Sequence, residues 1–341
     1  MKEPGQSHSH TWFGDFADQV AHPDQLAGTR LARVEGGGGD GARILSLWTP
    51  HGLEADLQVD RALDLLSVRY GGVRFGWAGP PGISPRGLYE PEGFGWQRTF
   101  YGGLLTTCGL EHVGDPVAIQ RSEQGAPGGR PVTYGEHGRI SHASSEITEC
   151  EIGPSGPQIR IRGLIRQGAI YDERFELART IDVDLSRPVI TISDTVRNTG
   201  SLAARHAILY HLNFGYPVAQ QGTFTLSGTK RHDFPAGAPD SPEEVIPWDV
   251  KRDADGQGFT TIISKEGSRF VECRQSATLP YFFLWIASRS RTKALGLVPT
   301  SSPLDDQVDY LEPDEERRYE LQLTFGSNLV NAFPQEGASE S

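Results

Sequence analysis

Apolar and polar residues alternate along many short runs of this chain, and no long stretch shows the 3.6-residue period of a helix. The runs are rich in Val, Ile, Thr, Phe and Tyr, and Gly, Pro, Asn and Asp separate them. In RRYELQLTF (317–325), Tyr319, Leu321 and Leu323 share one face, and polar side chains occupy the other. Such alternation predicts antiparallel strands with one buried side.

The predicted strands cover residues 42–49, 65–77, 158–167, 173–185, 188–198, 206–214, 259–264, 269–275, 281–287 and 317–325. NTGS (198–201) lies between two of them and predicts a hairpin connection. Two Pro- and Gly-rich segments, 78–96 and 232–258, predict long loops over one mouth of the sheet. No repeat or linker divides the chain, so we expect one all-β domain, a large antiparallel β-sandwich over residues 13–330. We expect the tails, 1–12 and 331–341, to be disordered.

Composition narrows the possible partners and the compartment. The 341 residues are 37% hydrophobic and 22% charged, which is typical of a globular protein with a sizeable core. The net charge of −12 disfavours nucleic acid or an anionic membrane as a partner. The polar amino terminus leads into no apolar segment, so a secretory signal is not expected. Three cysteines without a CxxC pair favour a reducing compartment, and we expect a cytoplasmic monomer or homodimer.

The strand HAILYHLNF (206–214) carries polar side chains where a core strand should be apolar. Side chains alternate across a strand, so residues 206, 208, 210, 212 and 214 form one mostly apolar face. The opposite face ends with His211 and Asn213. Because buried polar groups without partners cost a few kcal/mol, these two either bond to a neighbouring loop or belong to a site.

Three motifs occur in order along the chain: GGLLTTCGL (102–110), HGRIS (137–141) and HLNFGYP (211–217). Together they resemble a family related to the galactose mutarotases (aldose 1-epimerases) that long had no assigned function. The resemblance covers roughly residues 40–325. It implies a large antiparallel β-supersandwich, and it implies interconversion of the anomers of a small-molecule sugar.

The same resemblance implies roles for individual residues. His211 matches the general acid of the family, a role that suits an imidazole with a pKa near ~6.5. His137 and Arg139 match positions that hold sugar hydroxyls or the ring oxygen in mutarotases, and His137 is a second catalytic candidate. Asn213 could orient a sugar hydroxyl.

The chain departs from the family at the base, which is a glutamate on a late strand. Here KALGLVPTSSP (293–303) places Val298 at that position, and valine cannot accept a proton. A nearby carboxylate could substitute, and the nearest in sequence are Asp305, Asp306, Asp309 and Glu312. Alternatively, His137 and His211 catalyse a different reaction, or the protein binds sugar without turnover.

A metal is a further alternative. His137, His142 and His211, with His112 and Glu111, Glu136 or Glu146, could hold a divalent ion that supports lyase or hydratase chemistry on a keto-sugar. No other cofactor is expected.

Sugar sites commonly combine an aromatic face with a few polar groups. Trp77 and Trp96 flank a loop that could supply such a face, and Trp248 and Trp285 are further options. The predicted substrate-binding residues are Arg74, Trp77, Trp96, Arg98, Thr107, His112, Arg139 and Asn213.

Overall fold

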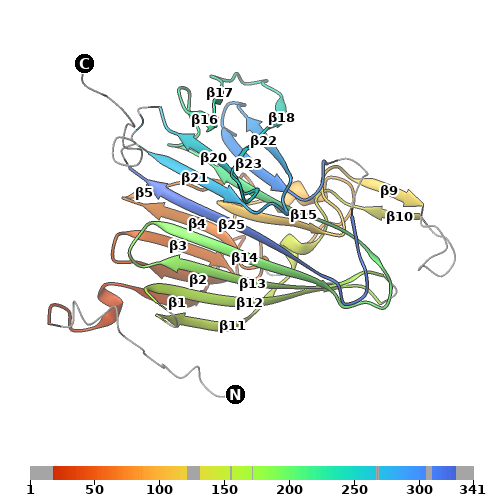
Figure 1. The fold of residues 1–341 in the computed structure, drawn as a ribbon, viewed down its shortest axis with the longest axis horizontal. Coiled ribbons are helices and arrows are strands. Elements are labelled where there is room, and N and C mark those ends of the chain that lie inside the picture. Colours follow the sequence, from red (N-terminus) through yellow and green to blue (C-terminus); the bar gives the residue numbers. More distant parts are fainter. Residues whose placement is uncertain are drawn as a thin grey trace.

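The structure, a computed structural model, describes residues 18–327 except 86, 121–130, 154–155, 171, 266, 268 and 305–308. The predicted tails, 1–12 and 331–341, lie outside the described residues. Antiparallel strands dominate the described part of the chain, which contains no α-helix, and the all-β prediction is confirmed (Figure 1). The described residues include three short 3-10 helices: η2 (Pro23–Gln25), η3 (Gly95–Arg98) and η4 (Ile140–His142). No helix of the described chain is long and apolar enough to span a membrane.

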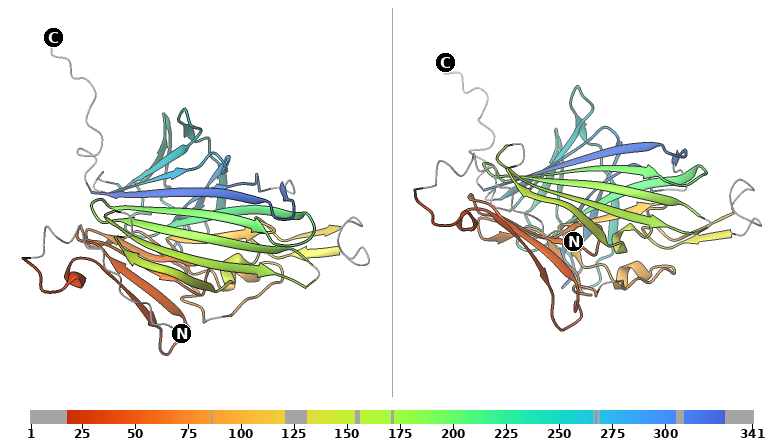
Figure 2. Two further views of the ribbon diagram at one scale, coloured as in Figure 1. Left: turned by 60° about the horizontal axis from the view of Figure 1, so that its bottom comes forward. Right: turned by 90° about the horizontal axis from the view of Figure 1, so that it is seen from below.

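Three large sheets form the body of the molecule. The first has five strands, in the order β1 (Gly28–Arg33), β2 (Arg43–Trp48), β3 (Leu53–Gln58), β4 (Asp64–Tyr70) and β5 (Val73–Arg74). The second has ten strands, namely β11 (Ser145–Ile152), β12 (Gln158–Gly168), β13 (Arg174–Asp184), β14 (Val189–Asn198), β25 (Glu316–Gly326), β21 (Phe270–Gln275), β20 (Gly258–Ile263), β16 (Phe224–Ser227) and β17 (Lys230–Asp233), with β19 (Lys251–Arg252) beside β20. Figure 2 shows the first sheet (red) lying as a layer against the long green strands of the second.

A third sheet, of six strands, contains the strand that carries His211 and Asn213. Its members are β18 (Glu243–Pro247), β22 (Tyr281–Ala287), β23 (Ala294–Thr300), β15 (Ala204–Phe214) and β24 (Asp309–Leu311), with β8 (Leu105–Leu110) also paired to β15. Two small sheets complete the fold: β6 (Trp77–Ala78) with β7 (Gly102–Gly103), and β9 (Val117–Gln120) with β10 (Pro131–Tyr134).

The predicted strands occur, except that 65–77 is not a single strand: β4 and β5 pair with each other across a turn at residues 71–72, and Trp77 begins β6. Two further local predictions are wrong. NTGS does not close a hairpin, because β14 lies in the ten-stranded sheet and β15 in the six-stranded one. Asn198 instead stabilises the connection between these two sheets, because its Nδ2 donates to the carbonyl oxygens of Leu202 and Leu311, each at 2.8 Å. Within the predicted loop 232–258, residues 243–247 form the edge strand β18 through pairing with β22.

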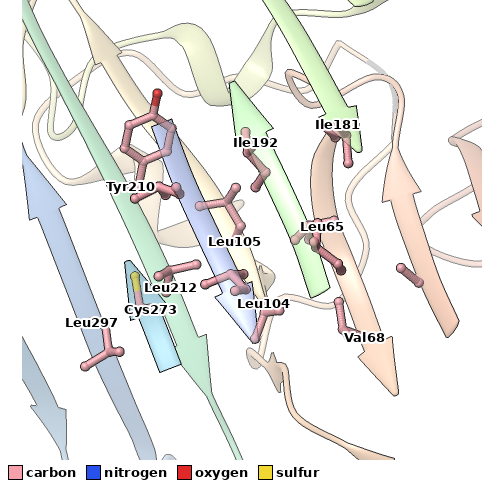
Figure 3. Close-up of a cluster of buried hydrophobic side chains, with 14 of the residues drawn as sticks. Leu65, Val68, Leu104, Leu105, Ile181, Ile192, Tyr210, Leu212, Cys273 and Leu297 are labelled. Carbon is pink, nitrogen blue, oxygen red and sulfur yellow. The ribbon is translucent and has the colours of Figure 1, made fainter. Parts of the chain in front are cut away.

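One hydrophobic cluster runs through all three large sheets, with members from Ala27 to Phe325. Figure 3 shows part of it, with Leu65 of β4, Leu105 of β8 and Ile192 of β14 packed near Tyr210 and Leu212 of β15. The apolar face of β15 is therefore in the core, as the alternation predicts. The opposite face of β15 ends with His211 and Asn213.

Candidate functional site

The second face of the six-stranded sheet borders a separate apolar cluster and an open cavity. Leu212 pairs with Leu297, and Phe283 pairs with Val298, so His211, Val298 and Phe283 are neighbours on one face across three strands. The cavity has a volume of about 530 Å³. Its titratable wall residues are Arg98, Glu136, His137, His211 and Glu243, and its aromatic wall residues are Trp77, Trp96, Phe100 and Trp285.

His211 lies in this wall with only 6% of its surface exposed. Its ring is edge-on to Trp285 at 5.0 Å and to Phe100 at 5.4 Å between centroids. A Cβ on Gly296 would lie 2.7 Å from Cβ of Trp285 and 3.4 Å from Cε1 of His211, so a glycine is needed for this packing. Burial lowers the pKa of His211 to about 4, against a smaller opposing effect of Asn213. The imidazole is therefore neutral near pH 7 in the free protein.

His137 is held rigidly beside it, with the two ring centroids 6.1 Å apart. The residue has a φ of 58°, which is uncommon for a side chain with a Cβ. The backbone N–H of Gly114 donates to Nδ1 of His137 at 3.2 Å, which leaves the ring proton on Nε2. Burial, with smaller effects of His211 and His112, lowers the pKa of His137 to about 3. His137 is thus a neutral hydrogen-bond donor.

Two glutamates also line the cavity. Glu136 is 8% exposed, and its Oε1 accepts a hydrogen bond from Nε2 of Gln97 at 2.9 Å. Its Oε2 is buried and has no hydrogen-bond partner among the described residues. The pKa of Glu136 is raised to about 7, chiefly by burial; the hydrogen bond from Gln97 opposes this shift, and the negative charges of Glu243 and Asp115 contribute to it. Glu243 accepts a hydrogen bond from Nε1 of Trp285.

The sequence reasoning considered Glu136 only as a metal ligand and did not consider Glu243 for the site. Glu136 directly precedes the HGRIS motif, which was an available signal. Glu243 lies in a segment whose composition predicted only a loop. Its place in the cavity follows from the pairing of β18 with β22, which a single sequence does not reveal.

Aromatic rings form most of the cavity wall. Trp96 stacks on Phe100 with 4.2 Å between ring centroids, and Trp77 lies 5.7 Å from both Phe100 and Trp285. Trp77, Trp96 and Arg98 thus border the cavity with His211 and His137. Their contact with sugar stays a prediction. Both predicted loops contribute here, the first through Trp96 and the second through Glu243.

Five other predicted site residues do not line this cavity, because they are engaged elsewhere in the fold. Arg139 forms ion pairs with Glu111 at 3.0 Å and with Glu173. The side chain of Thr107 is fully buried and donates to Asp64 at 2.6 Å.

The remaining three also bond to other parts of the protein. Arg74 donates to the hydroxyl of Tyr101 at 2.7 Å. Nε2 of His112 lies 2.6 Å from the carbonyl oxygen of Asp115. Asn213, fully buried, donates to the carbonyl oxygen of Gly102 at 3.0 Å. Asn213 therefore supports the strand that carries His211 rather than facing the cavity itself.

The predicted metal ligands are not assembled. His142 is held by Thr99, whose Oγ1 lies 2.7 Å from Nε2, and by Ser141, whose Oγ lies 3.0 Å from Nδ1. Burial lowers the pKa of His142 to about 3, and Arg61 adds to the effect. Within the described residues, no three His, Cys, Asp or Glu side chains are grouped to hold a metal ion.

Of the four predicted substitutes for the missing base, the two that the structure describes do not border the cavity. Asp309 is exposed and pairs with Arg317, and Glu312 is exposed in the turn before β25. Asp305 and Asp306 lie outside the described residues. Val298 is 4% exposed and packs in the apolar cluster with Trp77 and Trp285.

The fold places this chain in the class of galactose mutarotase-like β-supersandwiches. A Klebsiella pneumoniae protein provisionally described as an aldose 1-epimerase superposes with a TM-score of 0.76 at 21% identity, over 90% of this chain and 86% of that one. A galactose mutarotase-like protein from Clostridium acetobutylicum gives 0.59 at 13% identity, over 89% and 99%. The Slr1438 protein from Synechocystis gives 0.61 at 13% identity, over 87% and 100%. At these identities the likeness shows the fold alone.

The family itself follows from the sequence match. The chain belongs to the family described as a domain of unknown function (DUF4432), whose profile matches residues 39–325. No curated protein matches the sequence. The resemblance inferred from the three motifs is confirmed at the level of fold and family.

Proposed function

We propose that this protein interconverts the anomers of a free or modified aldose by acid/base proton transfer. The observation that carries the proposal is the position of His211, which borders an open cavity of about 530 Å³ with four aromatic side chains in its wall. A cavity of this size suits a monosaccharide, and aromatic faces pack against the apolar side of a sugar ring. The mutarotase-like fold supports the same class of reaction.

The reaction needs two groups that move protons. One accepts the proton of the anomeric hydroxyl, and the electrons of the C1–ring oxygen bond pass to the ring oxygen, which takes a proton from the other. The product is an open-chain aldehyde. Rotation about C1–C2 and reversal of both transfers give the other anomer with no net change in the protein.

His211 is one of these two groups. The family resemblance suggests the acid role, but the lowered pKa of about 4 keeps its ring neutral near pH 7 in the free protein. A neutral imidazole is ready to accept the anomeric proton during opening. The same nitrogen returns the proton during closure, when it acts as the acid.

A second candidate function is sugar binding without turnover. It is favoured by Val298, which occupies the place next to His211 where a basic carboxylate would be expected. The two functions share the cavity and differ only in whether protons move.

Exchange NMR with a panel of free aldoses tests both functions. Wild type should speed exchange between anomers, and His211→Asn should lower kcat/KM by about 100-fold or more, because general acid/base catalysis contributes that much. Sugar binding, followed by the fluorescence of the cavity tryptophans, should survive the substitution. His22→Asn, at a histidine whose side chain is 74% exposed, is the control. Binding without faster exchange would favour the second function. The absence of both binding and faster exchange would reject both functions.

A further inference from the structure

The wall of the cavity that His211 borders also includes Glu136, and only one of its two carboxyl oxygens has a hydrogen-bond partner among the described residues. Gln97 holds Oε1 of Glu136 at 2.9 Å, whereas Oε2 is buried with no hydrogen-bond partner in the described part of the chain. Leaving a buried polar atom without a partner is unfavourable, so a carboxyl oxygen in this state on a residue that borders the cavity points to a ligand contact.

The backbone of Glu136 is positioned as firmly as its side chain. Its N–H donates to the carbonyl oxygen of Gly93 at 3.1 Å. On the preceding residue, Gly135, a Cβ would lie 2.2 Å from the carbonyl oxygen of Pro91, so the two segments are in direct contact. On the other side, the N–H of His137 donates to the carbonyl oxygen of Gly114 at 3.0 Å. The segment is therefore pinned at both ends, as a proton-transfer group requires.

The other carboxylates near the cavity fit the role less well. Glu243 is exposed, and its carboxylate accepts from the indole of Trp285. Glu111 is bound by Arg139 and by Gln167, and it does not border the cavity. Only Glu136, among the described carboxylates, is buried, in the cavity wall and incompletely hydrogen-bonded.

We propose that Glu136 is the second proton-transfer group of the cavity and replaces the carboxylate that Val298 lacks. This inference rests on the proposed function. During ring opening, the imidazole of His211, which borders the cavity, accepts the anomeric proton on a ring nitrogen. The C1–ring oxygen electrons pass to the ring oxygen, which takes the proton from Oε2 of Glu136. An imidazolium and a carboxylate result, and closure reverses both transfers.

The groups that face Glu136 keep its proton available near neutral pH. Burial, opposed by the Gln97 hydrogen bond and aided by the negative charges of Glu243 and Asp115, raises its pKa to about 7. His137 and His211 are neutral there, because burial lowers the pKa of each. Arg98, the cation in the cavity wall, is paired with Glu90. A carboxyl group that is about half protonated at pH 7 suits general acid catalysis.

Glu136→Gln tests the inference, because the amide keeps the shape and can still accept from Gln97. For an aldose that wild type interconverts, kcat should fall about 100-fold or more, with sugar affinity within about threefold of wild type. Glu136→Asp should recover part of the rate. In wild type, kcat/KM should fall as the pH rises through about 7, and the glutamine variant should lose this limb. Glu146→Gln, at an exposed glutamate of β11 paired with Arg166, is the matched control.

Several results would overturn the inference. Retention of more than a third of the rate in Glu136→Gln would remove Glu136 from the reaction and leave the proposed function standing. A large loss in Glu243→Gln alone would move the role to that residue. If Glu136→Gln does not fold, a wild-type pH profile without a limb near 7 decides against Glu136. Wild type that speeds no aldose exchange would reject the proposed function and this inference together.

Discussion

Two buried polar clusters of this protein differ in how completely their hydrogen bonds are satisfied. In the core, Arg179 donates to Asp194 at 2.6 and 2.9 Å, to Asp64 at 2.8 Å, to Ala62 at 2.9 Å and to Thr107 at 2.8 Å. All five N–H groups of the guanidinium are used. In the cavity, by contrast, Nδ1 of His211 and Oε2 of Glu136 lack partners among the described residues.

The difference separates structure from function. A fully hydrogen-bonded cluster has no capacity left for a ligand, so Thr107 can contribute only to stability. A cluster with unsatisfied atoms beside an open cavity has such capacity, and its members have pKa values displaced by burial: His211 to about 4 and Glu136 to about 7. Substitutions in the first should change stability most, and those in the second should change catalysis and its pH dependence.

The largest effect on stability is expected for Arg179→Met. Removing the guanidinium leaves Asp194 and Asp64 buried without their counter-charge, which should lower the free energy of unfolding by about 3–5 kcal/mol. Urea denaturation measures the loss. Arg160→Met is the control, because its pair with Asp182 is partly exposed and should be worth about 1 kcal/mol or less. Equal losses in the two variants would contradict the distinction.

A smaller effect is expected from the charge of Glu136. Its pKa is raised from 4.5 to about 7 on folding, so the unfolded chain releases this proton first and wild-type stability falls as the pH rises between these values. Glu136→Gln has no such loss. Its free energy of unfolding relative to wild type should therefore increase by about 1–2 kcal/mol from pH 5 to pH 8, with solvent at the cavity mouth screening part of the effect. Urea denaturation at both pH values checks this, and a constant difference would count against it.

The cavity carboxylates should also select against anionic ligands. We expect a uronic acid to bind about tenfold more weakly than its neutral parent aldose at pH 8, because Glu136 and Glu243 repel its carboxylate. Titration calorimetry at low and high salt measures this ratio, which should shrink as salt screens the charges. Tighter binding of the acid would show that Arg98 governs the cavity instead.

The smallest change is expected for Arg98→Ala. Arg98 pairs with Glu90 at the surface, and its side chain is 67% exposed. Exposed ion pairs contribute little, so the free energy of unfolding should change by about 0.5 kcal/mol or less. A thermal or urea unfolding curve suffices, and a loss several times larger would mean that the pair organises the cavity loop.

Much of the fold was predictable from local patterns. The alternation in 206–214 assigned Ile208, Tyr210, Leu212 and Phe214 to the core, and all four are 1% exposed or less. It also marked His211 as exceptional, and the structure puts that ring in a cavity wall. These predictions succeeded because the two-residue period of a strand is a property of adjacent residues.

Tertiary structure decided the rest. The sequence presents Thr107, Arg139 and Glu136 as similar polar residues inside or beside motifs. Thr107 donates to Asp64 and Arg139 pairs with Glu111, whereas Glu136 borders the cavity and keeps a buried oxygen with no partner among the described residues. Likewise, only the pairing of β18 with β22 brings Glu243 to Trp285. Strand formation depends on neighbours in sequence, but burial, hydrogen bonding and pKa depend on partners from distant strands.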